Sequence, residues 1–79
     1  MVIGVTLVKV VRGFERSVYD ALSALSVLKE LYHVFGEYDF LAILEVDNLP
    51  LLSETVDSIR AMEGVITTHT VVGAEVQGA

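Results

Sequence analysis

The first and third extended segments of this chain are apolar on both of their faces. Residues 2–11 read VIGVTLVKVV. Successive side chains of a strand point to opposite faces, so Ile3, Val5 and Leu7 oppose Val8 and Val10. Residues 38–46, YDFLAILEV, repeat the pattern. Any sheet that contains these segments must be covered on both sides, because monomers rarely expose a large apolar face.

Helical spacing replaces this alternation twice, over residues 14–26 and 50–63. Each stretch carries an apolar stripe, which comprises Phe14, Val18, Leu22 and Leu25 in the first and Leu52, Thr55, Val56, Ile59 and Met62 in the second. Pro50 suits the first position of the second helix, and Asn48 or Asp47 can cap it. Gly64 is the expected stop signal.

The remaining segments complete the order of elements. Residues 27–35 and 65–76 favour strands, and residues 77–79 form a frayed tail. Only Gly36 and Glu37 separate the second strand from the third, which predicts a two-residue II′ hairpin turn. The resulting order, β-α-β-β-α-β, predicts an α+β fold of the ferredoxin-like type, with two helices on one face of a four-stranded antiparallel sheet.

Two helices can cover only one face of that sheet. The chain has 79 residues and no cysteine, so it forms one small domain without disulfides, and domains of this size often need oligomerisation for stability. We therefore predict a two-fold homodimer in which the uncovered sheet faces pack together, as in dimeric α+β barrels.

The charge of the chain limits its partners. The formal net charge is −6, with only five Lys and Arg residues, and direct nucleic-acid binding needs a cationic patch. No apolar run reaches the ~20 residues that span a bilayer, and no signal peptide is recognisable. A cytoplasmic protein that contacts neither nucleic acid nor membrane is the expectation.

Four stretches together resemble a known family. They are LVKVVRG in the first strand, VFGEYDFLAILEV in the hairpin, VDNLPLLSETVDSIRAMEGV around the second helix and TTHTVV in the last strand. With these motifs the chain resembles, over about residues 3 to 76, the effector-binding (RAM) domain of the Lrp/AsnC transcriptional regulators. Full regulators begin with a winged helix-turn-helix, whereas this chain starts at the first strand, so we expect residues 1–79 to be a stand-alone effector domain without a DNA-binding domain.

The resemblance implies a function and a site. Family members bind amino acids or similar small effectors where dimers meet, and their dimers assemble into tetramers, octamers or larger rings. A full-length Lrp/AsnC regulator is a further expected partner. Carried onto this chain, the ligand-binding positions are Gly36, Tyr38, Asp39, Thr68 and Thr70, with His33 and Val71 close by.

Each of these residues also has an ordinary structural explanation. Turn geometry alone accounts for Gly36, and the Asp39 carboxylate can accept hydrogen bonds from nearby backbone N–H groups instead of holding an α-ammonium group. Tyr38 can simply cover the end of the hairpin. Thr68 and Thr70 share a strand face, where they are good strand formers, and their hydroxyls could instead cradle a carboxylate.

The two histidines do not indicate a catalytic or metal site. His33 and His69 are the only histidines, and no ligand spacing for a metal ion repeats. His69 faces away from Thr68 and Thr70, toward a dimer interior or under the helices. No cofactor motif is present. Two alternatives to an amino-acid sensor stay open: an enzyme of the dimeric α+β barrel type and an ACT-like amino-acid-binding module.

Overall fold

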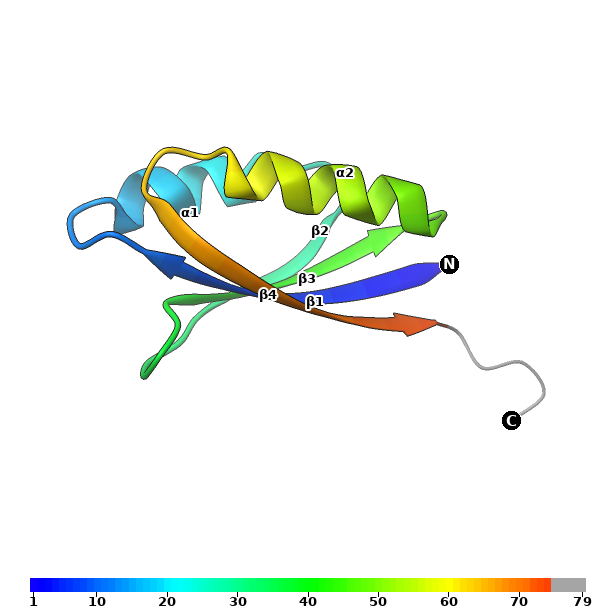
Figure 1. Cartoon of the computed structure of the whole chain (residues 1–79), viewed down its shortest axis with the longest axis horizontal. Coiled ribbons are helices and arrows are strands. Elements are labelled where there is room, and N and C mark those ends of the chain that lie inside the picture. Colours follow the sequence, from blue (N-terminus) through cyan, green and yellow to red (C-terminus); the bar gives the residue numbers. More distant parts are fainter. Residues whose placement is uncertain (75–79) are drawn as a thin grey trace.

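The computed structural model describes residues 1–74, which form the predicted order of elements. The elements are β1 Val2–Val10, α1 Glu15–Ser23, β2 Leu28–His33, β3 Phe40–Val46, α2 Leu49–Arg60 and β4 Val65–Ala74. All strand pairs are antiparallel, and the strand order in the sheet is β2-β3-β1-β4. Both helices lie on one face of the sheet (Figure 1). The ferredoxin-like prediction is confirmed, while the strand and tail predicted for residues 75–79 lie outside the described residues.

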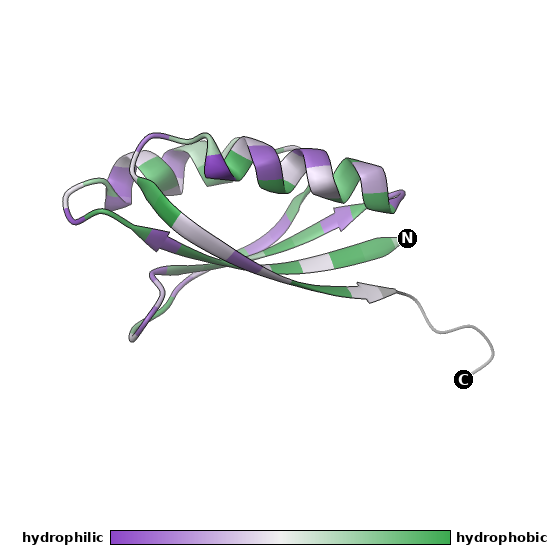
Figure 2. Cartoon of the chain, in the orientation of Figure 1, coloured by the Kyte–Doolittle hydropathy of each residue, from purple (hydrophilic) through white to green (hydrophobic). Residues whose placement is uncertain are grey.

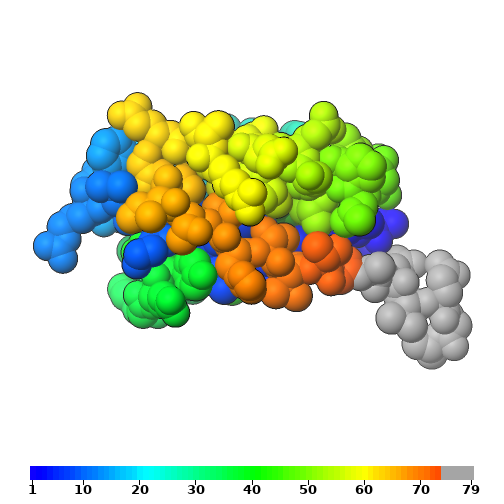
Figure 3. All heavy atoms as spheres, viewed as in Figure 1, coloured from blue at the N-terminus to red at the C-terminus, as the bar shows by residue number. Residues whose placement is uncertain are grey.

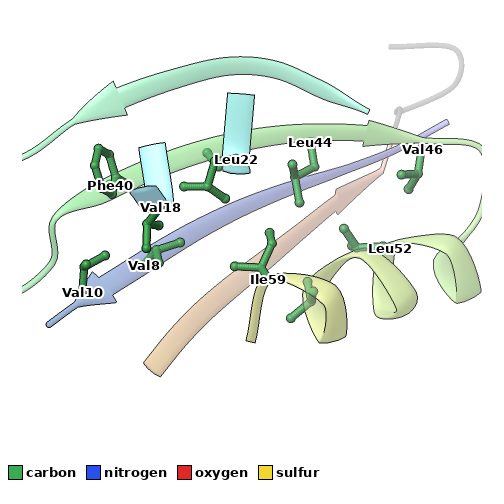
Figure 4. Close-up of a cluster of buried hydrophobic side chains, with 11 residues drawn as sticks. Val8, Val10, Val18, Leu22, Phe40, Leu44, Val46, Leu52 and Ile59 are labelled. Atoms are coloured by element: carbon green, nitrogen blue, oxygen red, sulfur yellow. The ribbon is translucent and has the colours of Figure 1, made fainter. Parts of the chain in front are cut away.

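The core lies between the helices and the sheet. Alternate side chains of β1 and β3 are buried, and those of the helical stripes meet them (Figure 4). The buried apolar residues are Val8, Val10, Val18, Leu22, Phe40, Ala42, Leu44, Val46, Leu52, Val56 and Ile59. Complete burial of one large aliphatic side chain contributes about 1.5–3 kcal/mol. Both predicted stripes are therefore core-facing.

Several predicted ends of elements are wrong by a few residues. The first helix ends at Ser23 rather than near residue 26, because the chain already turns back toward β2 there, with Leu25 N donating to Leu22 O at 3.1 Å. The second helix begins at Leu49, one residue before Pro50, and Asn48 is its N-cap: Leu51 N donates to Asn48 Oδ1 at 2.9 Å.

Gly64 does not end the second helix directly, because that helix already stops at Arg60. Gly64 lies in the connection to β4 and has a φ of +96°, a conformation that residues with a Cβ rarely adopt. A Cβ at this position would lie 2.5 Å from the Cβ of Phe14. The glycine thus lets this connection pass against the Phe14 side chain.

No segment within residues 1–74 covers the opposite face of the sheet (Figure 1), and the strands of the sheet are rich in apolar residues (Figure 2). We call this uncovered face the open sheet face. Its centre is formed by side chains that alternate with the buried ones and that are half-buried: Ile3, Val5 and Leu7 of β1 and Leu41 and Ile43 of β3. The prediction that the helices leave one apolar face uncovered is confirmed. No helix in this part of the chain has the length and apolar character needed to cross a membrane.

Candidate functional site

The link between β2 and β3 is longer than predicted. Val34 N donates to Asp39 O at 2.9 Å, so the pairing extends one step past the two strands and leaves residues 35–38 at the tip. The predicted two-residue turn is wrong, because a four-residue loop accommodates the same glycine. Gly36 has the expected positive φ, +118°, with open space around it. The hairpin projects away from the helices (Figure 1).

Asp39 fastens this hairpin to the end of β1. Its amide donates to Val8 O at 2.9 Å, and its Oδ2 accepts a hydrogen bond from Val10 N at 2.7 Å. Lys9 Nζ adds a third contact by donating to Glu37 O at 3.0 Å. The Asp39 carboxylate therefore does hold a backbone N–H, as the structural explanation proposed, but that N–H belongs to β1 rather than to the turn. We call these three contacts the Asp39 clamp.

Aromatic rings line the base of the hairpin. The centroid of the His33 ring lies 5.2 Å from that of Phe35 and 5.2 Å from that of Phe40. Phe35 is 91% exposed, which is rare for so large an apolar side chain held on a well-anchored loop. Tyr38, at the end of the loop, is half-buried.

The two threonines point toward the helices, and their hydroxyls already have partners. In the β1–β4 ladder Thr70 lies opposite Thr6 and Thr68 opposite Val8. Thr70 Oγ1 and Thr6 Oγ1 are hydrogen-bonded at 2.9 Å, and Thr68 Oγ1 accepts from Arg60 Nε at 3.0 Å. Figure 3 shows α2 lying against β4, where Arg60 contacts Thr68.

Val71 and His69 lie on the opposite side of β4. They pair with Val5 and Leu7, which belong to the open sheet face, and Val71 is 57% exposed. His69 therefore faces the expected dimer interior and does not lie under the helices. On the same face at the other edge, Tyr32 Oη donates to Glu30 Oε1 at 3.1 Å. This hydrogen bond and the charge of Glu30 raise the pKa of Tyr32 above 10.0.

One chain does not bring the predicted ligand-binding residues together. Gly36, Tyr38 and Asp39 lie on the hairpin, Thr68 and Thr70 lie beneath α2, and Val71 lies on the open sheet face. His33 lines a hollow of about 470 Å³ and Thr70 a different one of about 320 Å³. Among residues 1–74 no group of three His, Asp or Glu side chains is arranged to hold a metal ion.

The sequence did not predict several residues that contact Thr68 and Thr70 or that line the hollow beside His33. Thr6 and Arg60 engage the threonine hydroxyls, and Glu15, Arg16 and Tyr19 surround His33. Tyr19 lies one turn after both Glu15 and Arg16 along α1, at spacings of four and three residues, so this helix face was a signal available from the sequence. The threonine partners are far away in the chain and carried no such signal.

The open sheet face and the anchored hairpin define a small α+β binding module of ferredoxin-like fold. Residues 2–75 match the sequence model of the Lrp/AsnC ligand binding domain. The chain belongs to this family, and the resemblance noted from its motifs is confirmed.

Individual relatives agree with this assignment. The crystal structure of FFRP-DM1 is 35% identical, with a TM-score of 0.89 over 94% of this chain and 100% of that one. The HTH-type transcriptional regulator LysM of Sulfurisphaera tokodaii is 31% identical over 42 residues, which are 53% of this chain but only 30% of the regulator. A transcriptional regulator of Neisseria meningitidis, NMB0573, solved as a complex with L-Met, shares the fold at 15% identity, with a TM-score of 0.81 over 99% of this chain and 53% of that chain.

Proposed function

We propose that the protein binds an amino acid or a similar small metabolite as a regulatory effector. The observation that carries this proposal is the match to the Lrp/AsnC ligand binding domain over residues 2–75. The L-Met complex of the Neisseria meningitidis regulator, which has the same fold, supports an amino acid as the effector class. The protein then acts on transcription or metabolism through partners, among which a full-length Lrp/AsnC regulator is the first to test.

The effector site is proposed at the hairpin, where Tyr38 and Asp39 contact the ligand beside Gly36. Val10 N occupies Asp39 Oδ2, while no hydrogen bond from residues 1–74 to Oδ1 is present, so Oδ1 can accept from an α-ammonium group. Thr68 Oγ1 accepts from Arg60 Nε, so its O–H can still donate to a ligand carboxylate, and the O–H of Thr70 can do the same when Thr6 is the donor of their shared hydrogen bond. Because the predicted residues are dispersed on one chain, a second copy must complete the site.

We further propose that the open sheet face packs against the same face of a second copy. A two-fold arrangement covers the same patch on both copies with one contact. Such dimers then associate into tetramers, octamers or larger rings through their hairpin ends. An effector that binds only at the contact between dimers stabilises the larger assembly, because a ligand shifts an equilibrium toward the state that binds it.

The site is tested by calorimetry of the protein with each of the twenty amino acids. Asp39→Asn is the sharper variant, because an asparagine oxygen can still accept from Val10 N while the negative charge that attracts an ammonium group is lost. Asp39→Ala also breaks the clamp, so it reports on folding as well. We expect Asp39→Asn to weaken binding with little change in thermal stability. Absence of heat for every amino acid at millimolar concentration would contradict the proposal.

The dimer is tested by light scattering. Ile43→Glu places a charge in the open sheet face, whereas Ser53→Glu places the same charge on the exposed surface of α2 and is the matched control. We expect only the first variant to release monomers. A wild-type mass of 8.6 kDa at micromolar concentration would refute the face-to-face dimer.

The enzymatic alternative would need an active site between the helices and the sheet. Val8, Leu22 and Ile59 fill the centre of that space and have no exposed surface (Figure 4), so an active site would have to lie at its edges, where His33 and Thr70 line two separate hollows. An ACT-like module would associate edge to edge instead of face to face, so the light-scattering variants also distinguish that alternative.

A further inference from the structure

A hollow at one end of the molecule lies apart from the proposed effector site. Of the predicted ligand-binding residues, only His33 lines it. It has a volume of about 470 Å³ and lies between the first half of α1 and the adjoining ends of β2 and β3. Glu15, Arg16, Tyr19, His33 and Phe40 line it. We call it the α1 hollow.

The floor and walls of the α1 hollow are aromatic. Phe40 is 2% exposed, so its ring is fixed by the core. The His33 ring is stacked on Phe40 at 5.2 Å with an angle of 29° between planes, and the Tyr19 ring lies 6.2 Å from Phe40, tilted by 43°. Such surfaces favour an apolar or aromatic group, which can add an offset or edge-on ring contact.

Two neighbouring side chains of opposite charge border these rings. Arg16 uses only its Nε to contact Asp20, at 3.3 Å, which leaves the terminal nitrogens of its guanidinium for a carboxylate. Glu15 Oε1 accepts from Gly13 N at 2.8 Å, which holds this carboxylate in place while Oε2 keeps its capacity to accept from an ammonium group. An aromatic surface bordered by one cation and one anion matches the three parts of an amino acid.

We propose that the α1 hollow is a second binding site, contained within one protomer, for an α-amino acid with an aromatic or large apolar side chain. The α-carboxylate binds Arg16, the α-ammonium group binds Glu15, and the side chain lies between the exposed rings of Tyr19 and His33, above the buried Phe40. This inference shares with the proposed function only the class of ligand. It differs in place, because neither Asp39 nor a second copy takes part.

The test uses L-phenylalanine and two fragments of it on the full chain. Phenethylamine lacks the carboxylate and 3-phenylpropionate lacks the ammonium group, so both should bind more weakly than the complete amino acid by calorimetry. Arg16→Gln should lower the affinity for L-phenylalanine about tenfold, because it removes a hydrogen bond between charged groups. In NMR spectra the ring protons of Tyr19 and His33 should shift during the titration.

Matched variants separate this site from the one at the hairpin. Lys29→Gln removes the same charge from another exposed ion pair, with Glu45, and should leave the affinity for L-phenylalanine unchanged. The Arg16 side chain is 87% exposed, so its replacement does not endanger folding. Glu15→Gln, which keeps an acceptor for Gly13 N, is a second variant. It should weaken the binding of L-phenylalanine more than the binding of 3-phenylpropionate.

Three results would overturn the inference. The first is binding of L-phenylalanine that depends on Asp39 but not on Arg16, which would leave the proposed function intact. The second is binding of other amino acids without any binding of L-phenylalanine at millimolar concentration. The third is equal affinity for L-phenylalanine and both fragments, which would exclude recognition of the two charged groups.

Discussion

Replacement of Thr70 by valine measures how much one hydrogen bond inside the sheet contributes to the free energy of unfolding. Valine has nearly the shape of threonine, so the change removes a hydroxyl and leaves the packing in place. Thr6, opposite Thr70, has no exposed surface, and its hydroxyl is 2.9 Å from that of Thr70. In Thr70→Val the Thr6 hydroxyl is therefore left buried without this partner.

The expected costs of the two single changes differ. A buried polar group that loses its partner costs about 1–3 kcal/mol, so Thr70→Val should lower the free energy of unfolding by roughly that amount. Thr6→Val leaves the hydroxyl of Thr70, which is only half-buried and can turn to water, so a smaller cost of about 0.5–1.5 kcal/mol is expected. The double variant should cost less than the sum, because paired hydroxyls replaced by matching apolar groups are nearly neutral.

The assay is urea unfolding of the wild type, both single variants and the double variant, analysed as a double-mutant cycle. Protein concentration must be the same throughout, since association makes stability depend on it. A loss of 1 kcal/mol corresponds to about 4–8 °C in Tm for a domain of this size. Strictly additive costs would show that the two hydroxyls do not depend on each other in solution, and a larger loss for Thr6→Val than for Thr70→Val would contradict the argument from burial.

Three further outcomes follow from the geometry. Gly36→Ala should cost about 1–2 kcal/mol for its positive φ, and Gly64→Ala should cost more because its new methyl group also meets the side chain of Phe14; equal costs in thermal unfolding would contradict that contact. In an ultraviolet titration Tyr32 should ionise above pH 10.0, and Glu30→Gln should lower the midpoint of that titration. The hydrogen bond between Tyr32 and Glu30 therefore stabilises the fold below pH 10.0, and this stabilisation is lost as the pH rises through the raised pKa of Tyr32. Asn48→Ala should lower the stability by about 1 kcal/mol through loss of the cap, while Asn48→Asp should keep it; a neutral alanine variant would show that the cap contributes nothing.

Periodicity was enough to predict the order of elements, because both helices and the strands β1 and β3 are anchored by stripes of core residues. Val18 and Leu22 of α1 and Leu52, Val56 and Ile59 of α2 are all buried as the helical spacing predicted. The alternation in β1 and β3 likewise predicted two apolar faces. These are local patterns, and local patterns survive in the fold when the core depends on them.

The hairpin shows where local patterns stop being sufficient. A glycine with positive φ fits both a two-residue turn and the observed four-residue loop, so Gly36 could not decide between them. Beside the pair formed by His33 and Phe40, the carboxylate of Asp39 accepts a hydrogen bond from Val10 N, 29 residues away in the chain. Such a contact has no signature in the sequence near the turn.

The candidate site was likewise predictable only where local patterns determine it. The sequence correctly predicted that Thr68 and Thr70 share a face and that His69 points the other way, because strand alternation is local. It could not predict which face lies under the helices, nor that Thr6 and Arg60 would engage the two hydroxyls. The same limit applies to the dispersal of Gly36, Asp39, Thr70 and Val71 over separate parts of the molecule.

The Asp39 clamp also has a consequence for how the protein opens locally. The amide of Val10 is bound by a side chain of the hairpin, and the next amide, Val11 N, donates to Gly64 O at 2.8 Å. Hydrogen bonds thus link the end of β1 both to the hairpin and to the connection between α2 and β4. Their amide protons should exchange with solvent in one cooperative event rather than residue by residue, so a molecule that stiffens the hairpin would slow exchange as far away as the loop around Gly64.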